Sequence, residues 1–255
     1  MNARRTLAAL TALVPVLAAF AQAPAPAAPD AAKPVPPRRV HPMAALMANP
    51  AAWVEPEHFI AVVNEGGAAD AAWLAEFLPA VEKYCQLRLQ IVELDAAPDA
   101  SPAALLARAR AAAGDNARAF LVLADDFAEP ILTAPGSGWA VMSPAWVTAD
   151  KAADDAKTRD RLGKQFYRAL GLMFGAGFRI EREAVLRDAP TPAALDEALS
   201  RNFHPQNLAV VQAVAQRLGL EMRRLKSRSE LEAMGLLKPR EPKPEPAPEG
   251  AVPAP

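Results

Sequence analysis

The sequence has a single cysteine among its 255 residues, and only three histidines. One cysteine cannot form a disulfide within the chain, and it excludes zinc sites built from several cysteines. Cys85 falls among apolar residues at helical spacing without a catalytic signature, so we expect a buried structural thiol. The histidines, His41, His58 and His204, are scattered along the chain and predict no shared metal site. We expect His204 to cap a helix.

The chain also lacks an excess of charge of either sign. Its 28 Lys and Arg residues stand against 29 Asp and Glu residues, which gives a formal net charge of -1. Nucleic-acid-binding domains carry a basic patch or stripe, and none is present, so we expect no nucleic-acid partner. With 52% hydrophobic and 22% charged residues, the chain is long enough to bury one core of ordinary size.

Residues 1–21 are predicted to be an export signal. Arg4 and Arg5 form its basic part, residues 7–20 are apolar, and the small side chains around Ala21 suit cleavage after that residue. The apolar run is too short for a comfortable membrane span. We therefore expect a bacterial protein that is periplasmic or secreted, with no stable membrane anchor after cleavage. An uncleaved signal anchor is the alternative.

The composition of both ends predicts disorder. Residues 22–42 are rich in Pro and Ala, and residues 237–255 repeat Pro with Glu, Lys and Ala. Such segments contain too few large apolar side chains to bury a core, so we expect a disordered linker and a disordered tail. The folded unit is then one domain, residues 43–236.

Strand and helix patterns alternate within this domain. Short apolar runs rich in β-branched residues predict strands, and helical spacing of apolar residues after capping residues predicts helices. The expected strands cover 59–64, 87–94, 119–124 and 139–142, and the expected helices cover 69–85, 101–114, 156–172, 191–200, 204–219 and 229–234. Pro79 predicts a kink or a break in the first helix.

This order predicts an α/β fold, with a mixed, mostly parallel sheet, flanking helices and a helical C-terminal part. The last strand is expected at the edge of the sheet because Pro144 follows it, and proline is tolerated only at an edge or a strand end. That strand consists of Trp139, Ala140, Val141 and Met142.

Three stretches carry a resemblance to a known family. They are the strand at 59–64, the two segments 120–126 and 138–143, and the helix from Arg161 to Phe174. In this order they resemble the archaemetzincin branch of the metzincin zinc peptidases, over most of residues 57–215. The resemblance implies a metzincin-like fold, in which the strand at 139–142 is the antiparallel edge strand that lines the substrate cleft.

The helix differs from the family's motif at the positions that bind zinc and at the position of the general base. Metzincins carry the motif H-E-x-x-H-x-x-G-x-x-H. With Gly171 at the glycine, the three His positions fall on Lys164, Arg168 and Phe174, and the Glu position falls on Gln165. Gly171 is expected to end the helix.

Those substitutions remove the zinc chemistry. A catalytic zinc ion needs three neutral or anionic donors around an open position. Lys164 and Arg168 are cations at neutral pH and would repel the ion, and Gln165 cannot serve as the general base that a glutamate provides. We therefore expect a degenerate member, a pseudoenzyme with no catalytic residues, no metal and no cofactor.

The sequence thus predicts an exported, catalytically silent domain that binds a peptide or protein by strand addition along residues 139–142. Arg168 would pair with a carboxylate or a bound C-terminus. Two functional alternatives stay open. One is an active peptidase or hydrolase with a non-standard site, and the other is a structural envelope interaction module tethered by its Pro-rich ends. The alternative for the fold is an ordinary α/β domain unrelated to peptidases.

Overall fold

The structure is a computed structural model that describes residues 42–97, 101–125, 127, 129–149, 153–179, 181 and 184–239. The predicted export signal, His41, nearly all of the linker and most of the tail lie outside these residues. No helix in the described ranges combines the length and the apolar character needed to cross a membrane.

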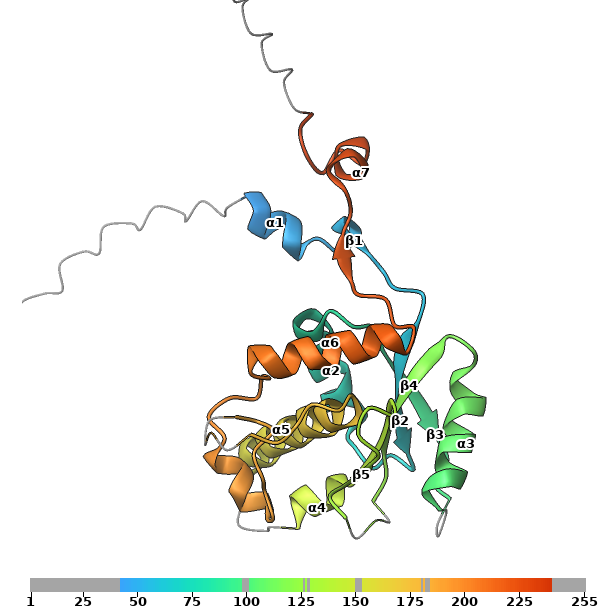
Figure 1. Cartoon of the computed structure of the whole chain (residues 1–255), viewed down its shortest axis with the longest axis vertical. Coiled ribbons are helices and arrows are strands. Elements are labelled where there is room, and N and C mark those ends of the chain that lie inside the picture. The colour runs from blue at the N-terminus through green and yellow to red at the C-terminus, as the bar shows by residue number, and fades with distance from the viewer. Residues whose placement is uncertain are drawn as a thin grey trace, which may run out of the picture. The chain divides into compact units, whose positions relative to one another are not determined.

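The elements follow one another along the chain as the predicted alternation requires (Figure 1). The strands are β1 (Trp53–Val54), β2 (Phe59–Glu65), β3 (Leu89–Leu94), β4 (Ala117–Leu123), β5 (Ile131–Thr133), β6 (Trp139–Met142) and β7 (Arg224–Leu225). The helices are α1 (Pro42–Ala48), α2 (Ala71–Cys85), α3 (Pro102–Ala113), α4 (Pro144–Thr148), α5 (Asp155–Met173), α6 (Pro205–Arg217) and α7 (Arg228–Ala233), with 3₁₀ turns η1 (Pro50–Ala52) and η2 (Pro192–Glu197).

The main sheet has five strands in the order β3-β2-β4-β6-β5. Strands β3, β2, β4 and β6 are parallel, and β5 pairs antiparallel with β6. The predicted fold class, a mostly parallel mixed sheet with flanking helices and an antiparallel edge strand, is confirmed. A second, two-stranded sheet joins β1 to β7 antiparallel and was not predicted.

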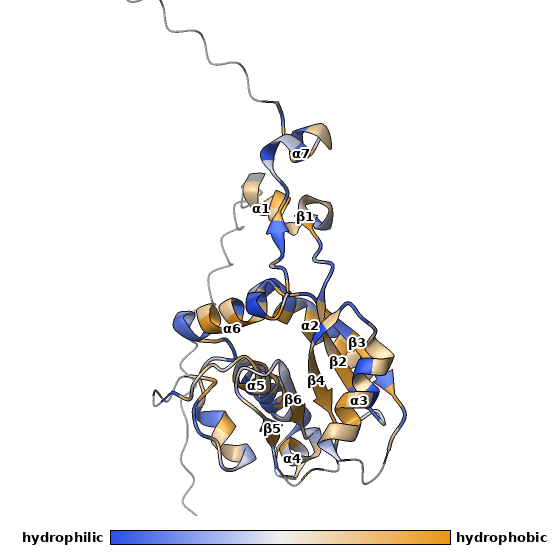
Figure 2. Cartoon of the chain, turned by 45° about the vertical axis from the view of Figure 1, so that its right-hand side comes forward, coloured by the Kyte–Doolittle hydropathy of each residue, from blue (hydrophilic) through white to orange (hydrophobic). Residues whose placement is uncertain are grey.

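Alternating side chains of the strands fill two cores, one on each face of the main sheet. Helix α3 covers one face, and helices α2, α5 and α6 cover the other (Figure 1). Every residue of β2 is buried, as expected for a central parallel strand with helices on both sides. Figure 2 shows that β2, β4 and β6 are mainly hydrophobic.

The edge of the sheet is not where the sequence placed it. Residues Trp139–Met142 form β6, which is parallel to β4 and lies one strand inside the edge. The antiparallel edge strand is β5, which the sequence analysis missed. Strand β5 has only three residues and is bounded by Pro130 and Pro135, so it is too short to show an alternating pattern.

Pro79 does not break α2, which runs through it as one helix. Pro79 is on the exposed side of α2, where water can satisfy the carbonyl group that loses its helical hydrogen bond. Pro144 ends β6 as expected, but it also begins the short helix α4. The side chain of Ser143 caps that helix by accepting a hydrogen bond from the backbone N–H of Trp146.

Candidate functional site

Helix α5 carries the residues that the sequence singled out. It begins after Asp154, whose side chain accepts a hydrogen bond from the backbone N–H of Lys157 at 2.7 Å. Phe166, Leu170 and Met173 form an apolar side that is completely buried in the core with the sheet. The predicted bounds, 156–172, differ from the observed ones by one residue at each end.

The polar side of α5 is buried as well. Arg161, Lys164, Gln165 and Arg168 occur at spacings of three and four residues, which place them on one side of the helix. They are 1%, 5%, 0% and 4% exposed, respectively. Charged side chains are almost never fully buried unless they are paired, so these groups must find partners inside the protein.

The segment from Val185 to Phe203, which includes η2, covers this polar side. Leu186, Leu195 and Phe203 in it are buried, and η2 packs against α5. A Cβ atom at Gly171 would lie 2.8 Å from Cδ2 of Leu186 and 2.9 Å from Cε1 of Phe203. Gly171 is therefore a packing residue, because only a glycine lets the segment approach α5 this closely.

Gly171 does not end the helix, contrary to the prediction. It lies within α5, which continues to Met173. The chain turns at Gly175, whose φ of 78° lies in the left-handed region that favours glycine. The backbone N–H of Gly175 donates to the carbonyl oxygen of Leu172 at 2.8 Å, which closes the end of the helix.

Lys164 is held by two partners. Its Nζ donates to the carbonyl oxygen of Leu195 at 3.0 Å and lies 2.7 Å from Oδ2 of Asp160, one turn earlier in α5. Asp160 also accepts a hydrogen bond from Nε of Arg201 at 2.6 Å. Burial acts to raise the pKa of Asp160, but the hydrogen bonds from Lys164 and Arg201 outweigh it and lower this pKa below its ordinary value.

Arg161 makes the strongest pair on this side of α5. Its Nε and terminal nitrogen donate to the two carboxylate oxygens of Asp196 in η2, each at 2.7 Å. Nζ of Lys157 lies 2.9 Å from the same carboxylate. The hydrogen bond from Arg161 is the main cause that lowers the pKa of Asp196 to about 2.

Gln165 connects α5 to the edge of the sheet. Its Nε2 donates to the carbonyl oxygen of Pro130, the residue before β5, at 3.1 Å. Its Oε1 accepts a hydrogen bond from a terminal nitrogen of Arg168 at 2.9 Å. Both polar atoms of the Gln165 amide, at the position that the metzincin motif gives to its general base, are therefore engaged inside the protein.

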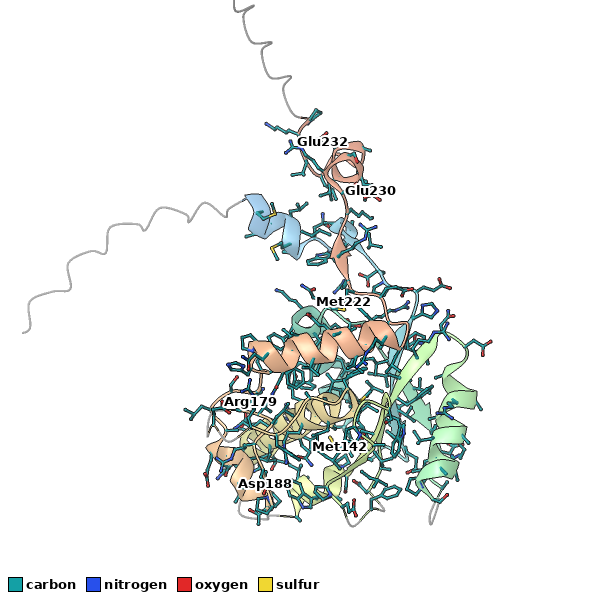
Figure 3. All side chains as sticks on the ribbon, in the orientation of Figure 1. Met142, Arg179, Asp188, Met222, Glu230 and Glu232 are labelled. Atoms are coloured by element: carbon teal, nitrogen blue, oxygen red, sulfur yellow. The ribbon has the colours of Figure 1, made fainter. Side chains whose placement is uncertain are left out.

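Arg168 is the least satisfied of the four polar groups. Its Nε is buried and has no hydrogen-bond partner among the described residues. Burial lowers the pKa of Arg168 to about 10, and the charge of Asp188 opposes this shift, so the guanidinium stays protonated at neutral pH. Asp188 is exposed and belongs to the segment between α5 and η2 (Figure 3).

The hydrogen bonds of β6 show which backbone groups of β5 point outward. The backbone N–H of Ala124 donates to the carbonyl oxygen of Met142 on the β4 side of β6, and that of Ser143 donates to Pro130 on the β5 side. Because bonding alternates along antiparallel strands, Leu132 faces β6, and the backbone groups of Ile131 and Thr133 point outward. No backbone hydrogen bond links those two residues to another described segment outside the sheet.

The other sequence-predicted residues lie apart from this cluster. Trp139 and Val141 pack with the α3 core, whereas Ala140 and Met142 pack with the α5 core. Figure 3 shows Met142 in the interior of the domain. Residues 139–142 therefore offer no free backbone edge for strand addition, since both of their backbone edges pair with neighbouring strands.

Cys85 is buried, as predicted, and burial raises its pKa to about 12. His204 caps α6 as predicted, by accepting a hydrogen bond from the backbone N–H of Gln206 at 3.4 Å. His58 lies elsewhere, between Glu221 and Arg118, at 2.8 Å and 2.7 Å from them.

The residues that align with the zinc ligands of the metzincin motif do not fit a zinc ion. Nζ of Lys164 is already bound to Leu195 and Asp160, Arg168 carries a guanidinium, and Phe174 presents an apolar ring that is completely buried. None of these groups can donate an electron pair to a metal at neutral pH. Within the described ranges, no group of three His, Cys, Asp or Glu side chains is placed to hold a metal ion.

Sequence reasoning missed Asp160, Asp196 and the edge strand β5. Asp160 precedes Lys164 by four residues on the same helix, a spacing that favours an ion pair and could have indicated it. Asp196 is 35 residues from Arg161, and no local pattern predicts that they meet.

No family model and no curated protein matches the sequence. Solved structures with a similar backbone include an archaemetzincin from Methanopyrus kandleri, with 16% identity and a TM-score of 0.49, covering 63% of this chain and 97% of that one. A zinc-dependent peptidase from Methanocorpusculum labreanum has 16% identity, a TM-score of 0.47 and coverage of 60% and 99%. An archaemetzincin from Archaeoglobus fulgidus, complexed with malonate, has 13% identity, a TM-score of 0.46 and the same coverage.

Proposed function

We propose that this chain is an exported, non-catalytic binding domain that takes an extended peptide, or an extended segment of a partner protein, as an additional strand on β5. The observation that carries the proposal is the outward direction of the backbone groups of Ile131 and Thr133. A strand added to a sheet edge binds through such main-chain groups, and neighbouring side chains supply specificity. The site is thus one strand further out than the sequence predicted.

Two polar side chains of α5 support binding without catalysis. Lys164 is held by Asp160 and the carbonyl oxygen of Leu195, and Gln165 is held by Pro130 and Arg168. A general acid or base must reach a reacting group, but these side chains are turned to internal partners. We therefore assign them to the scaffold beneath the binding edge.

The experiment compares two variants of Thr133 in binding to a library of N-acetylated hexapeptides. Thr133→Pro removes the outward N–H, and we expect it to lower the affinity for selected peptides about fivefold or more, since a net hydrogen bond contributes about 1 kcal/mol. Thr133→Val keeps that N–H and is the matched control for the lost hydroxyl group. Equal affinity of the two variants, or the absence of any bound peptide, contradicts strand addition on β5.

Incubation of the same library with the purified domain tests the non-catalytic part of the proposal. We expect intact peptides by mass spectrometry. Cleavage that copurifies with the domain, and that is lost with a substitution inside it, would favour an active hydrolase instead.

Export follows from the N-terminal pattern and is part of the proposal. We expect the protein recovered from the periplasm or the medium to begin at Gln22. Intact mass spectrometry of the recovered protein distinguishes this from an uncleaved signal anchor.

A further inference from the structure

A cavity of about 260 Å³ lies at the carboxyl edge of the main sheet. Its walls come from residues 68–70, which follow β2, from α4, which follows β6, and from the first two turns of α5. Strand β4 lies between β2 and β6, so these walls stand on either side of its carboxyl end. No residue of β5 is among the described residues that line the cavity. The cavity is therefore separate from the proposed binding edge.

The order of the strands makes this edge a place where α/β proteins bind ligands. From the carboxyl end of β2 the chain continues through α2 to β3, on one side of β2. From the carboxyl end of β4, on the other side of β2, it continues to β5 at the opposite edge of the sheet. Neighbouring strands whose connections run in opposite directions leave a crevice at their carboxyl ends, and ligands of open α/β sheets bind there.

Asn64 fixes the wall that follows β2. Its buried side chain accepts a hydrogen bond from the backbone N–H of Ala69 at 2.9 Å and donates to the carbonyl oxygen of the same residue at 3.1 Å. Its Nδ2 also donates to Oε2 of Glu93 on β3 at 3.0 Å. Asp70 then caps α2 by accepting a hydrogen bond from the backbone N–H of Trp73 at 2.6 Å. These bonds hold the wall in place before a ligand arrives, which lowers the entropic cost of binding.

The buried side chains that line the cavity are apolar. Trp73 of α2 and Leu162 of α5 are among them, and both belong to the core. The ring of Trp73 stacks on that of Phe77, with 4.8 Å between the ring centroids, which fixes its orientation. Sites for drug-sized ligands have volumes of about 300–1,000 Å³, so this cavity suits a smaller molecule with a compact apolar part.

The exposed side chains at the cavity include charges of both signs. Asp155 and Arg159 line it and lie one turn apart on α5. Asp160 and Lys164 have the same spacing and form an ion pair at 2.7 Å. In contrast, neither Asp155 nor Arg159 forms an ion pair within 4.0 Å with any described residue. Asp70 is engaged as the cap of α2, so the free charges at this cavity are one carboxylate and one guanidinium.

We propose that this cavity binds a zwitterionic α-amino acid with an aliphatic side chain. The aliphatic side chain lies against Trp73 and Leu162. The carboxylate of the ligand pairs with Arg159, whose guanidinium matches it in geometry, and the ammonium group donates to Asp155. A ligand with a charge of only one sign leaves Arg159 or Asp155 without a partner, so the two groups together select the zwitterion. The inference does not depend on strand addition at β5.

The experiment compares four small molecules by isothermal titration calorimetry with the full mature protein. L-Leucine carries both charges, isopentylamine lacks the carboxylate, and isocaproate lacks the ammonium group. L-Serine carries both charges but lacks the aliphatic side chain. We expect L-leucine to bind and each of the other three to bind about threefold more weakly or worse, since charged pairs that water reaches contribute less than buried ones.

Two variants assign the charges of the ligand to residues of α5. Arg159→Met should weaken the binding of L-leucine and leave that of isopentylamine unchanged, because the amine has no carboxylate. Asp155→Asn should weaken the binding of L-leucine and leave that of isocaproate unchanged. Both positions are exposed, so we expect the variants to fold, and circular dichroism checks this. Arg217→Met, at an exposed position of α6 that does not line the cavity, is the matched control for the loss of a positive charge.

The affinity for L-leucine decides the inference. A loss in both Arg159→Met and Asp155→Asn, but not in Arg217→Met, supports it. Binding of isopentylamine or isocaproate as tight as that of L-leucine overturns it, because one of the two charges is then not recognised. An unchanged affinity for L-leucine in Arg159→Met or in Asp155→Asn also overturns it. If none of the four molecules binds at millimolar concentration, the inference fails, whereas strand addition at β5 is decided separately by Thr133→Pro.

Discussion

Arg161 and Asp196 meet through two hydrogen bonds of 2.7 Å, across 35 residues of sequence. The side chain of Arg161 is 1% exposed, whereas that of Asp196 is 29% exposed. The pair therefore joins a fully desolvated cation to a carboxylate that water still reaches, and it fixes η2 on α5.

Replacement of Arg161 should be destabilising. Arg161→Met leaves Asp196 with Lys157 alone and removes two charge-assisted hydrogen bonds, so we expect the free energy of unfolding to fall by about 1–3 kcal/mol. Urea denaturation followed by circular dichroism measures the change. The matched control is Arg187→Met, which breaks a more exposed pair with Glu197 and should cost about 0–1 kcal/mol. Equal effects of both variants would argue against a special role for the Arg161 pair.

The same pair predicts a pH dependence. The pKa of Asp196 is about 2 in the folded protein and has its ordinary value, near 3.8, in the unfolded chain. The folded state thus binds this proton less readily, and its stabilising effect is present above pH 4 and is lost as the pH falls from about 4 to 2. We expect the difference in Tm between the wild type and Asp196→Asn to shrink over that range. A constant difference from pH 7 to pH 2 would exclude the mechanism.

Gly171 offers a test of the close packing on α5. Gly171→Ala gains helix propensity but places Cβ 2.8 Å from Leu186 and 2.9 Å from Phe203. Overpacking of this kind costs about 1–3 kcal/mol, which exceeds the gain in propensity of about 1 kcal/mol. Gly163→Ala, in the same helix, meets the ring of Phe77 at 3.3 Å and should be better tolerated. Thermal unfolding of both variants makes the comparison, and a more stable Gly171→Ala would refute it.

Replacement of Arg168 should affect the stability of the protein in the opposite direction to replacement of Arg161. Burial lowers its pKa to about 10, so the cation is disfavoured in the folded state relative to water. We expect Arg168→Met to keep or raise the stability of the free protein, because replacing a poorly compensated buried charge by an apolar side chain is often neutral or stabilising. Differential scanning calorimetry measures Tm. A loss as large as that of Arg161→Met would show that Arg168 is a structural residue.

The sequence was sufficient to predict the helices and strands that show a local hydrophobic pattern. The β-branched run at 59–64 predicted β2, and the apolar spacing of Leu162, Phe166 and Leu170 predicted α5 almost to its ends. Strand β5 could not be predicted, because its three residues are too few to show an alternating pattern. Because β5 was not predicted, the edge of the sheet was expected at Trp139–Met142, one strand inside the observed edge.

The candidate site was only partly accessible to sequence reasoning. The spacing of Lys164, Gln165 and Arg168 placed these residues on one side of a helix, as the structure shows. Polar residues at this spacing usually indicate a solvent-exposed face, but this face is buried. The burial of this face depends on residues 185–203, which pack through Leu186 and Leu195. Tertiary packing of a distant segment therefore overrides the local signal.

The segment of residues 185–203, which covers the polar side of α5, has a consequence for folding. Before η2 docks, the cations Arg161 and Lys164 are hydrated, and burying them alone would be costly. Their protein partners, Asp196 and the carbonyl oxygen of Leu195, become available only when residues 185–203 arrive. Contacts of long sequence separation carry a larger cost of loop closure, which slows folding. A nascent chain that stops before η2 would therefore leave Arg161 and Lys164 of α5 without these partners.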